Sequence, residues 1–155
     1  MSAELWRHYR DASGTKYDVN FNYLKDDPGL RKVVQGQLDD WQAQALTSCQ
    51  SGGACEFKAD SKWLGVSLKT PDNKVGIGHA QVRVTGNALS DGKSVGMTFK
   101  VQVYKDWNFD KGKTAFSVNL SRYEAMHEYG YAQEFAMTSS SPVYGYNGMY
   151  ANSCG

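Results

Sequence analysis

Two alternating runs joined by an Asp-Gly turn constrain the fold of this chain more than any other feature. The first run, GHAQVRVTGNAL, alternates Ala80, Val82 and Val84 with polar neighbours. The second run, SVGMTFKVQVYKDW, places an apolar side chain at every other position from Val95 to Val103. Such alternation is typical of strands with one buried face, and Asp-Gly between two of them is typical of a hairpin turn. The pattern predicts a long antiparallel hairpin with one face in water.

A segment with helical periodicity precedes the hairpin. In DDPGLRKVVQGQLDDWQAQALTSC, Asp27 occupies an N-cap position and Pro28 the first helical position. Apolar residues then recur at spacings of three and four, at Leu30, Val34, Leu38, Trp41 and Ala45. The stripe predicts a long helix that packs on the sheet. Gly36 within it costs about 1 kcal/mol relative to alanine, which suggests that another backbone approaches closely there.

Other segments carry shorter signals. WLGVSLKT and YAQEFAMT predict short strands, and the tail SSSPVYGYNGMYANSCG predicts a surface loop or a sheet edge. In LSRYEAMHEYG, Ser121 and Glu124 match a capping box, and Gly130 suits a left-handed residue after a helix end. These residues predict a short second helix.

Length and composition indicate one domain that spans residues 1–155. A chain of 155 residues, 41% apolar and 21% charged, can bury a single core. We expect an α+β fold, with a long N-terminal helix packed on a twisted antiparallel β-sheet and a short second helix. The net charge of +1 gives no broad field for a polyanion, so nucleic acid is a less favoured partner, although a nuclease needs only a local patch. No run of about 18 apolar residues exists that would predict a transmembrane segment.

Cys49 and Cys55 flank a Ser-Gly-Gly tip after the long helix. A metal site would need further Cys or His ligands at recognisable spacing, and a redox pair would have two intervening residues at a helix start. A disulfide is feasible because the Gly-Gly tip lets the chain reverse, and it would stabilise the fold by about 2 kcal/mol and indicate an oxidising compartment. Two reduced thiols in a cytosolic protein are the alternative. Cys154 has no assigned role.

Two stretches resemble parts of the C-terminal toxin modules of bacterial polymorphic toxins and secreted antibacterial effectors. LWRHYRDASGTKYDVNF resembles the junction at which such modules begin. VYKDWNFDKGK and SRYEAMHEYGYAQEFAMTSSS resemble a stretch in which an Asp-aromatic-Asn turn precedes a short helix and a strand. Together they cover about a third of the chain. The resemblance implies an effector that a cognate immunity protein neutralises, without naming a reaction.

An envelope-directed effector fits the expected disulfide, because a target's periplasm is oxidising. We therefore expect a secreted protein that acts in the periplasm of the target cell and hydrolyses peptidoglycan or a lipid-linked precursor. The chain lacks the G-x-S-x-G, H-E-x-x-H and phosphate-loop signatures. Colicin-M-like lipid II hydrolases carry Asp-x-Tyr-Asp followed by His-Arg, and YKDWNFD shares only the acidic and aromatic character of that pattern. No cofactor is expected, except that a divalent cation fits the acidic residues.

The candidate catalytic residues are His127, Asp106, Asp110 and His79. His127, near the end of the short helix, suits a general acid, or it simply caps the last carbonyl groups. Asp106 and Asp110 at the hairpin end suit an acid/base pair or a cation site, or they serve solubility alone. His79 lies on the polar face of the hairpin, which is either a substrate platform or only solvated.

Two further functions stay open. Small toxin ribonucleases often pair an N-terminal helix with an antiparallel sheet and use His, Arg and Tyr, so His8, Tyr9 and Arg10 are candidates for a ribonuclease site. The chain is also rich in Tyr and Trp, whose rings stack well on sugars. A non-catalytic carbohydrate-binding module is therefore the third possibility.

Overall fold

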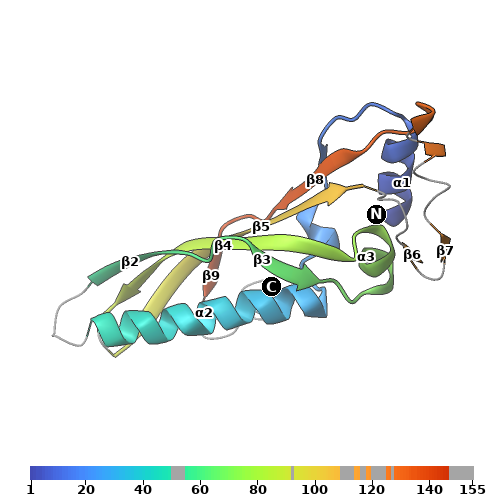
Figure 1. The fold of residues 1–155 in the computed structure, drawn as a ribbon. Coiled ribbons are helices and arrows are strands. Elements are labelled where there is room, and N and C mark those ends of the chain that lie inside the picture. Colours follow the sequence, from blue (N-terminus) through green and yellow to red (C-terminus); the bar gives the residue numbers. More distant parts are fainter. Residues whose placement is uncertain are drawn as a thin grey trace.

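The chain folds into helices and strands that surround one long hairpin (Figure 1). The computed structural model describes residues 1–49, 55–91, 93–108, 114–115, 118–119, 125–126 and 128–146. The helices are α1 (Ser2–Arg10), α2 (Pro28–Ser48) and α3 (Pro71–Gly76), with a 3-10 turn at Phe21–Tyr23. The strands are β1 (Tyr17–Asp18), β2 (Cys55–Asp60), β3 (Leu64–Ser67), β4 (His79–Ser90), β5 (Val95–Trp107), β6 (Thr114–Ala115), β7 (Val118–Asn119), β8 (Phe135–Ser140) and β9 (Tyr144–Tyr146). The α+β class is confirmed.

The predicted hairpin is the centre of the sheet. Strands β4 and β5 pair antiparallel in one register, from Gln81 opposite Tyr104 to Ser90 opposite Val95. Strands β3 and β2 both pair with the outer edge of β4, β3 near its start and β2 near its end. In the same way, β9 and β8 both pair with the outer edge of β5, β9 near its start and β8 near its end. Strand β1 pairs with β8 in parallel. The described sheet is therefore mixed, and the expectation of a purely antiparallel sheet is wrong at this edge. Strands β6 and β7 pair only with each other among the described residues.

The two faces of the hairpin differ as the alternation predicts. Val82, Val84, Val101 and Val103 are buried, and they share the covered face, on which the helices pack. None of the side chains that point the other way from β4 and β5 is buried. We call this second surface the open face, and its residues on these two strands are His79, Gln81, Arg83, Thr85, Asn87, Leu89, Gly96, Thr98, Lys100, Gln102, Tyr104 and Asp106.

Helix α2 is the predicted long helix, and its buried side chains are those of the predicted stripe: Leu30, Val34, Leu38, Trp41 and Ala45. It runs along the covered face and contacts β3, β4 and β5 (Figure 1). The expectation that the long helix would be the N-terminal one is wrong, because α1 precedes it. The sequence of α1 is short and mostly polar, and it folds as a helix against aromatic side chains rather than through a long apolar stripe.

The close backbone approach expected at Gly36 is also wrong. Gly36 is exposed, and a Cβ atom built on it would meet nothing within 4 Å. The approach occurs instead at Gly29, where a Cβ atom would lie 2.0 Å from the backbone oxygen of Ser67. Glycine is therefore needed at the first turn of α2, where the helix meets β3.

Aromatic side chains close the end of the core that α2 does not reach. The ring of Trp107 lies 4.9 Å from Trp6, 5.5 Å from Tyr9 and 5.2 Å from Phe135, measured between centroids. The indole nitrogen of Trp107 also donates to the carbonyl of Gly76 at the end of α3. This cluster holds α1 and α3 at the far end of the hairpin.

The weaker sequence signals have mixed outcomes. Strand β3 matches WLGVSLKT, whereas β2 was not predicted and β8 begins at Phe135 rather than at Tyr131. Residues 125, 126 and 128 are helical and Gly130 has a φ of 74°, as expected after a helix end. The capping-box residues Ser121 and Glu124 lie outside the described residues. The tail contributes β9 at a sheet edge, as predicted.

Candidate functional site

Cys49 and Cys55 form a disulfide, as one of the sequence alternatives predicts. Cys49 follows the last residue of α2, and Cys55 begins β2. Their Cα atoms lie 5.9 Å apart, within the range that a disulfide spans. The bridge ties the end of the long helix to an edge strand of the sheet. Cys154 lies outside the described residues.

His79 and Asp106 come to the same end of the open face. His79 is exposed at the start of β4, opposite Ser67 on β3. Asp106 is exposed near the end of β5, opposite Ala136 on β8. The pairing of β4 with β5 ends with Gln81 opposite Tyr104, and His79 and Asp106 each lie two residues beyond that pair. Two candidates that are 27 positions apart in sequence therefore share one end of the sheet.

Hydrogen bonds fix the surroundings of these two residues. The hydroxyl of Tyr104 donates to Oδ1 of Asp106, two residues along the same strand. This hydrogen bond, with burial and the charge of Asp106, raises the pKa of Tyr104, so the tyrosine keeps its proton at neutral pH. From the same strand, Nζ of Lys105 reaches across and donates to the carbonyl of His79 on β4 at 3.0 Å. The carboxylate is thereby oriented and the start of β4 is held against β5.

A shallow hollow of about 340 Å³ lies beside Asp106. Its lining is Gly14, Asp106, Trp107, Asn108, Glu134, Phe135 and Ala136. Glu134 brings a second carboxylate to this end of the face. Together, a histidine, two carboxylates and a tyrosine hydroxyl give this end groups that bind or transfer protons.

Asp110 and His127 lie outside the described residues, so their roles stay predictions. The same holds for an acid/base pair of Asp106 with Asp110. Within the described part of the chain, no group of three or more His, Cys, Asp or Glu side chains is placed to hold a metal ion. The divalent cation that the acidic residues suggested also stays a prediction.

The trio proposed for a ribonuclease site does not assemble as a site. Tyr9 is fully buried in the aromatic cluster, and burial together with the charge of Glu134 raises its pKa to about 12. The ring of His8 packs 4.6 Å from Phe135, and its Nε2 lies 2.7 Å from the carbonyl oxygen of Thr15. Tyr9 therefore cannot touch a substrate, whereas the role suggested for His8 and Arg10 stays a prediction. The α1 segment has a packing role instead.

The open face also carries residues that the sequence analysis did not single out. Trp63 lies between β2 and β3, is 44% exposed, and has its ring centroid 6.0 Å from that of Tyr104. Next to them, Arg83 forms an ion pair with Asp60. The sequence did contain a signal for Trp63. In WLGVS, alternation places Trp63 on the same side as Gly65, opposite to Leu64 and Val66, which pack in or against the core.

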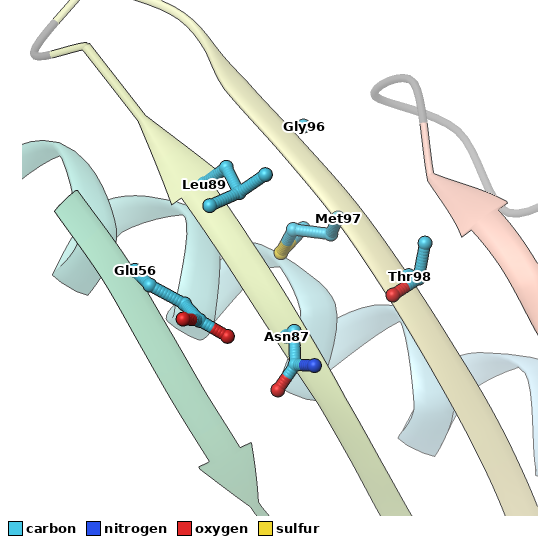
Figure 2. A pocket seen from close by; sticks show the side chains of 6 residues that line it. All are labelled: Glu56, Asn87, Leu89, Gly96, Met97 and Thr98. Atoms are coloured by element: carbon cyan, nitrogen blue, oxygen red, sulfur yellow. The ribbon is translucent and has the colours of Figure 1, made fainter. Parts of the chain in front are cut away.

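A second hollow, of about 390 Å³, lies on the open face at the other end of the hairpin. Figure 2 shows Asn87, Leu89 and Glu56 along its rim, with α2 passing behind the strands. The hollow exists because Gly96, which has no side chain, pairs with the 63% exposed Leu89. The open face thus has an exposed leucine beside a hollow at one end and ionisable side chains at the other.

Comparisons with protein-family models, with curated proteins and with solved structures gave no match. Among the described helices, none combines the length and the apolar character that crossing a bilayer requires. The case for a function therefore depends on the geometry of the open face.

Proposed function

We propose that this chain is a secreted antibacterial effector domain that acts on the envelope of a target cell through the open face of its sheet. The observation that carries the proposal is the position of His79 and Asp106 at one end of a face that no buried side chain interrupts. The Cys49–Cys55 disulfide supports an oxidising site of action such as a periplasm. The net charge of +1 supports a substrate other than a polyanion.

In this proposal the reaction is hydrolysis of peptidoglycan or of a lipid-linked precursor. Asp106, held by the Tyr104 hydroxyl, accepts a proton from the attacking water. His79 donates a proton to the leaving group. The residues next to them on β4 and β5 hold the substrate by hydrogen bonds. A cognate immunity protein neutralises the effector by covering this face.

The test is expression in a bacterium with and without a periplasmic export signal. We expect killing only with export, and loss of killing in His79→Ala and in Asp106→Asn. Asp40→Ala, on the exposed surface of α2, is the matched control and should kill like the original chain. Killing by exported His79→Ala and Asp106→Asn at the original level would overturn the assignment of these residues.

A cytosolic ribonuclease is the second candidate. Small toxin ribonucleases use His, Arg and Tyr, and the open face brings His79, Arg83 and Tyr104 onto neighbouring strands. Arg83 is already paired with Asp60, which weakens its attraction for phosphate. Killing only without export, with cleavage of total RNA or tRNA that His79→Ala abolishes, would favour this candidate over the envelope hydrolase.

A further inference from the structure

Trp63 is an aromatic side chain held on the open face by a strained connection. It follows Lys62, whose φ of 58° lies in the left-handed region that residues other than glycine rarely adopt. Such a conformation is strained and persists only where the surroundings impose it. Irregular residues between two edge strands commonly re-aim a side chain next to a functional site. The connection between β2 and β3 is therefore a candidate for positioning Trp63 as well as for joining two strands.

Hydrogen bonds to β4 impose this conformation. Oγ of Ser61 accepts the backbone N–H of Val84 at 2.8 Å, and the N–H of Ser61 donates to the Val84 carbonyl at 2.9 Å. Oδ1 of Asp60 accepts the N–H of Lys62 at 2.8 Å and the Nε–H of Arg83 at 2.9 Å. The backbone that leads into Trp63 is therefore held in place before any ligand arrives, whereas the ring itself contacts Tyr104. A backbone that is already ordered lowers the entropy lost on binding.

The surface around Trp63 combines a second aromatic ring with polar side chains. Tyr104 lies with its ring at 58° to that of Trp63 and with a hydroxyl directed to Asp106. Gly65 presents no side chain beside them, and a Cβ atom there would meet nothing within 4 Å. Gln81 pairs with both Gly65 and Tyr104, so its amide lies in the same row.

Two of the charges near the ring, those of Asp60 and Arg83, neutralise each other. The hydrogen bond from Arg83, with that from the Lys62 backbone, lowers the pKa of Asp60 to about 2, so the pair is ionised at neutral pH. A phosphate backbone requires cations that are available to it, and here the nearest guanidinium already holds a carboxylate. An uncharged ligand with many hydroxyl or amide groups matches the aromatic rings and Gln81 better.

We propose that Trp63 and Tyr104 form a stacking subsite for a pyranose ring of a neutral glycan. The amide of Gln81 and the Asp60–Arg83 pair hydrogen-bond to its hydroxyl or acetamido groups. The subsite crosses β3, β4 and β5 next to the end of the sheet that carries His79 and Asp106, because Gln81 and Tyr104 are each two residues from them. The identification of the glycan as part of an envelope polymer rests on the proposed function. The binding of a glycan at this subsite does not rest on it.

The probes are purified insoluble peptidoglycan, in a pull-down, and the soluble N-acetylglucosamine tetramer, in a titration. We expect Trp63→Ala to bind both about tenfold more weakly, because a ring contact of this kind contributes on the order of 1.4 kcal/mol. Trp63→Phe should retain most of the affinity. Tyr129→Ala, which removes a 76% exposed ring outside the strands, is the matched control and should bind like the original chain.

Several results would overturn the subsite. The first is that the original chain binds neither probe. The second is that Trp63→Ala binds as well as the original chain, or that Tyr129→Ala loses as much binding as Trp63→Ala. The third is that single-stranded RNA displaces the tetramer. Failure of the proposed function is seen separately. If His79→Ala and Asp106→Asn still kill while Trp63→Ala loses glycan binding, the subsite stands and the catalytic assignment fails.

Discussion

The two faces of the sheet use polar groups in opposite ways. On the covered side, the carboxylate of Asp27 is 1% exposed and is surrounded by donors. On the open side, Asp60 and Arg83 pair at the surface beside an exposed tryptophan. The first arrangement joins the start of α2 to α3 and to the residues that precede α3, and the second leaves groups exposed at the surface. If the open face carries the proposed function, stability and function are separated across one sheet.

Asp27 shows how the covered side is held together. Its carboxylate accepts the N–H groups of Gly29 and Leu30 at the start of α2, those of Lys69 and Thr70 before α3, and the amide of Asn73 within α3. Burial alone would raise its pKa, but the hydrogen bonds from Thr70, Asn73 and Lys69 outweigh that effect and lower it.

The largest loss of stability should follow from Asp27→Ala. Removing the carboxylate takes away a helix cap and leaves several buried N–H groups without an acceptor, so we expect a loss of about 3 kcal/mol in the free energy of unfolding. Urea denaturation measures it. Asp40→Ala, an exposed change on the same helix, should change stability by less than about 0.5 kcal/mol. Equal effects of the two changes would contradict this role.

The pH dependence of stability gives a second test of the role of Asp27. Because the folded pKa of Asp27 lies below the ordinary value, its contribution is fully present above about pH 4 and is lost as the pH falls through the folded pKa. Between about pH 6 and pH 2, the original chain should therefore lose more stability than Asp27→Ala does. Parallel stability curves for the two proteins would show that Asp27 is not linked to folding.

Two glycines of α2 provide the next comparison. Gly29→Ala should cost about 2 kcal/mol, because its Cβ atom would lie 2.0 Å from the Ser67 oxygen and the helix must move. Gly36→Ala should instead stabilise by up to about 1 kcal/mol, since it faces open space and alanine favours helix. Thermal unfolding of both variants measures the difference. Effects of the same sign would refute the packing described here.

Loss of the disulfide should cost about 2 kcal/mol, since the bridge closes only a short loop. The double change Cys49→Ser with Cys55→Ser, compared with the original chain with and without reductant, measures the cost. Thiol titration of protein matured in a periplasm provides the control. Reactive thiols at both positions in that protein would remove the support that the bridge gives to an extracytoplasmic site of action.

The smallest effects on stability should come from the open face. His79→Ala, Asp106→Asn and Trp63→Ala remove exposed or half-buried groups, so each should change the free energy of unfolding by less than about 0.5 kcal/mol. Circular dichroism with thermal melting checks this. A loss comparable to that of Asp27→Ala in any of them would mean that the open face is also part of the folding core.

The sequence allowed the covered side to be predicted better than the open side. A helix that buries Leu30, Val34, Leu38, Trp41 and Ala45 leaves a periodic pattern, and so does a hairpin with one wet face. The short α1 could not be predicted in this way, because it is held by ring contacts to Trp107 and Phe135, which are distant in sequence. Similarly, β1 is only two residues long and depends on β8.

The candidate site was only partly predictable. His79 and Asp106 were selected as chemical groups, but their shared position depends on the hairpin register. Alternation indicates the side on which Trp63 lies but not the residue that it contacts. That residue is Tyr104, and the contact reaches from the start of β3 across β4 to β5. Tyr9 was a misleading candidate, because adjacent ionisable residues in a helix do not reveal which side chain will be buried. Register and long-range contacts carry the missing information.

The most direct test of the separation between the two faces is nuclear magnetic resonance of the folded chain titrated with the N-acetylglucosamine tetramer. Side-chain amide and indole signals report on both faces at once. The account predicts shifts for Trp63, Gln81 and Gln102, with the exposed Gln44 of α2 unchanged. Shifts centred on α2, or equal shifts on both faces, would contradict it.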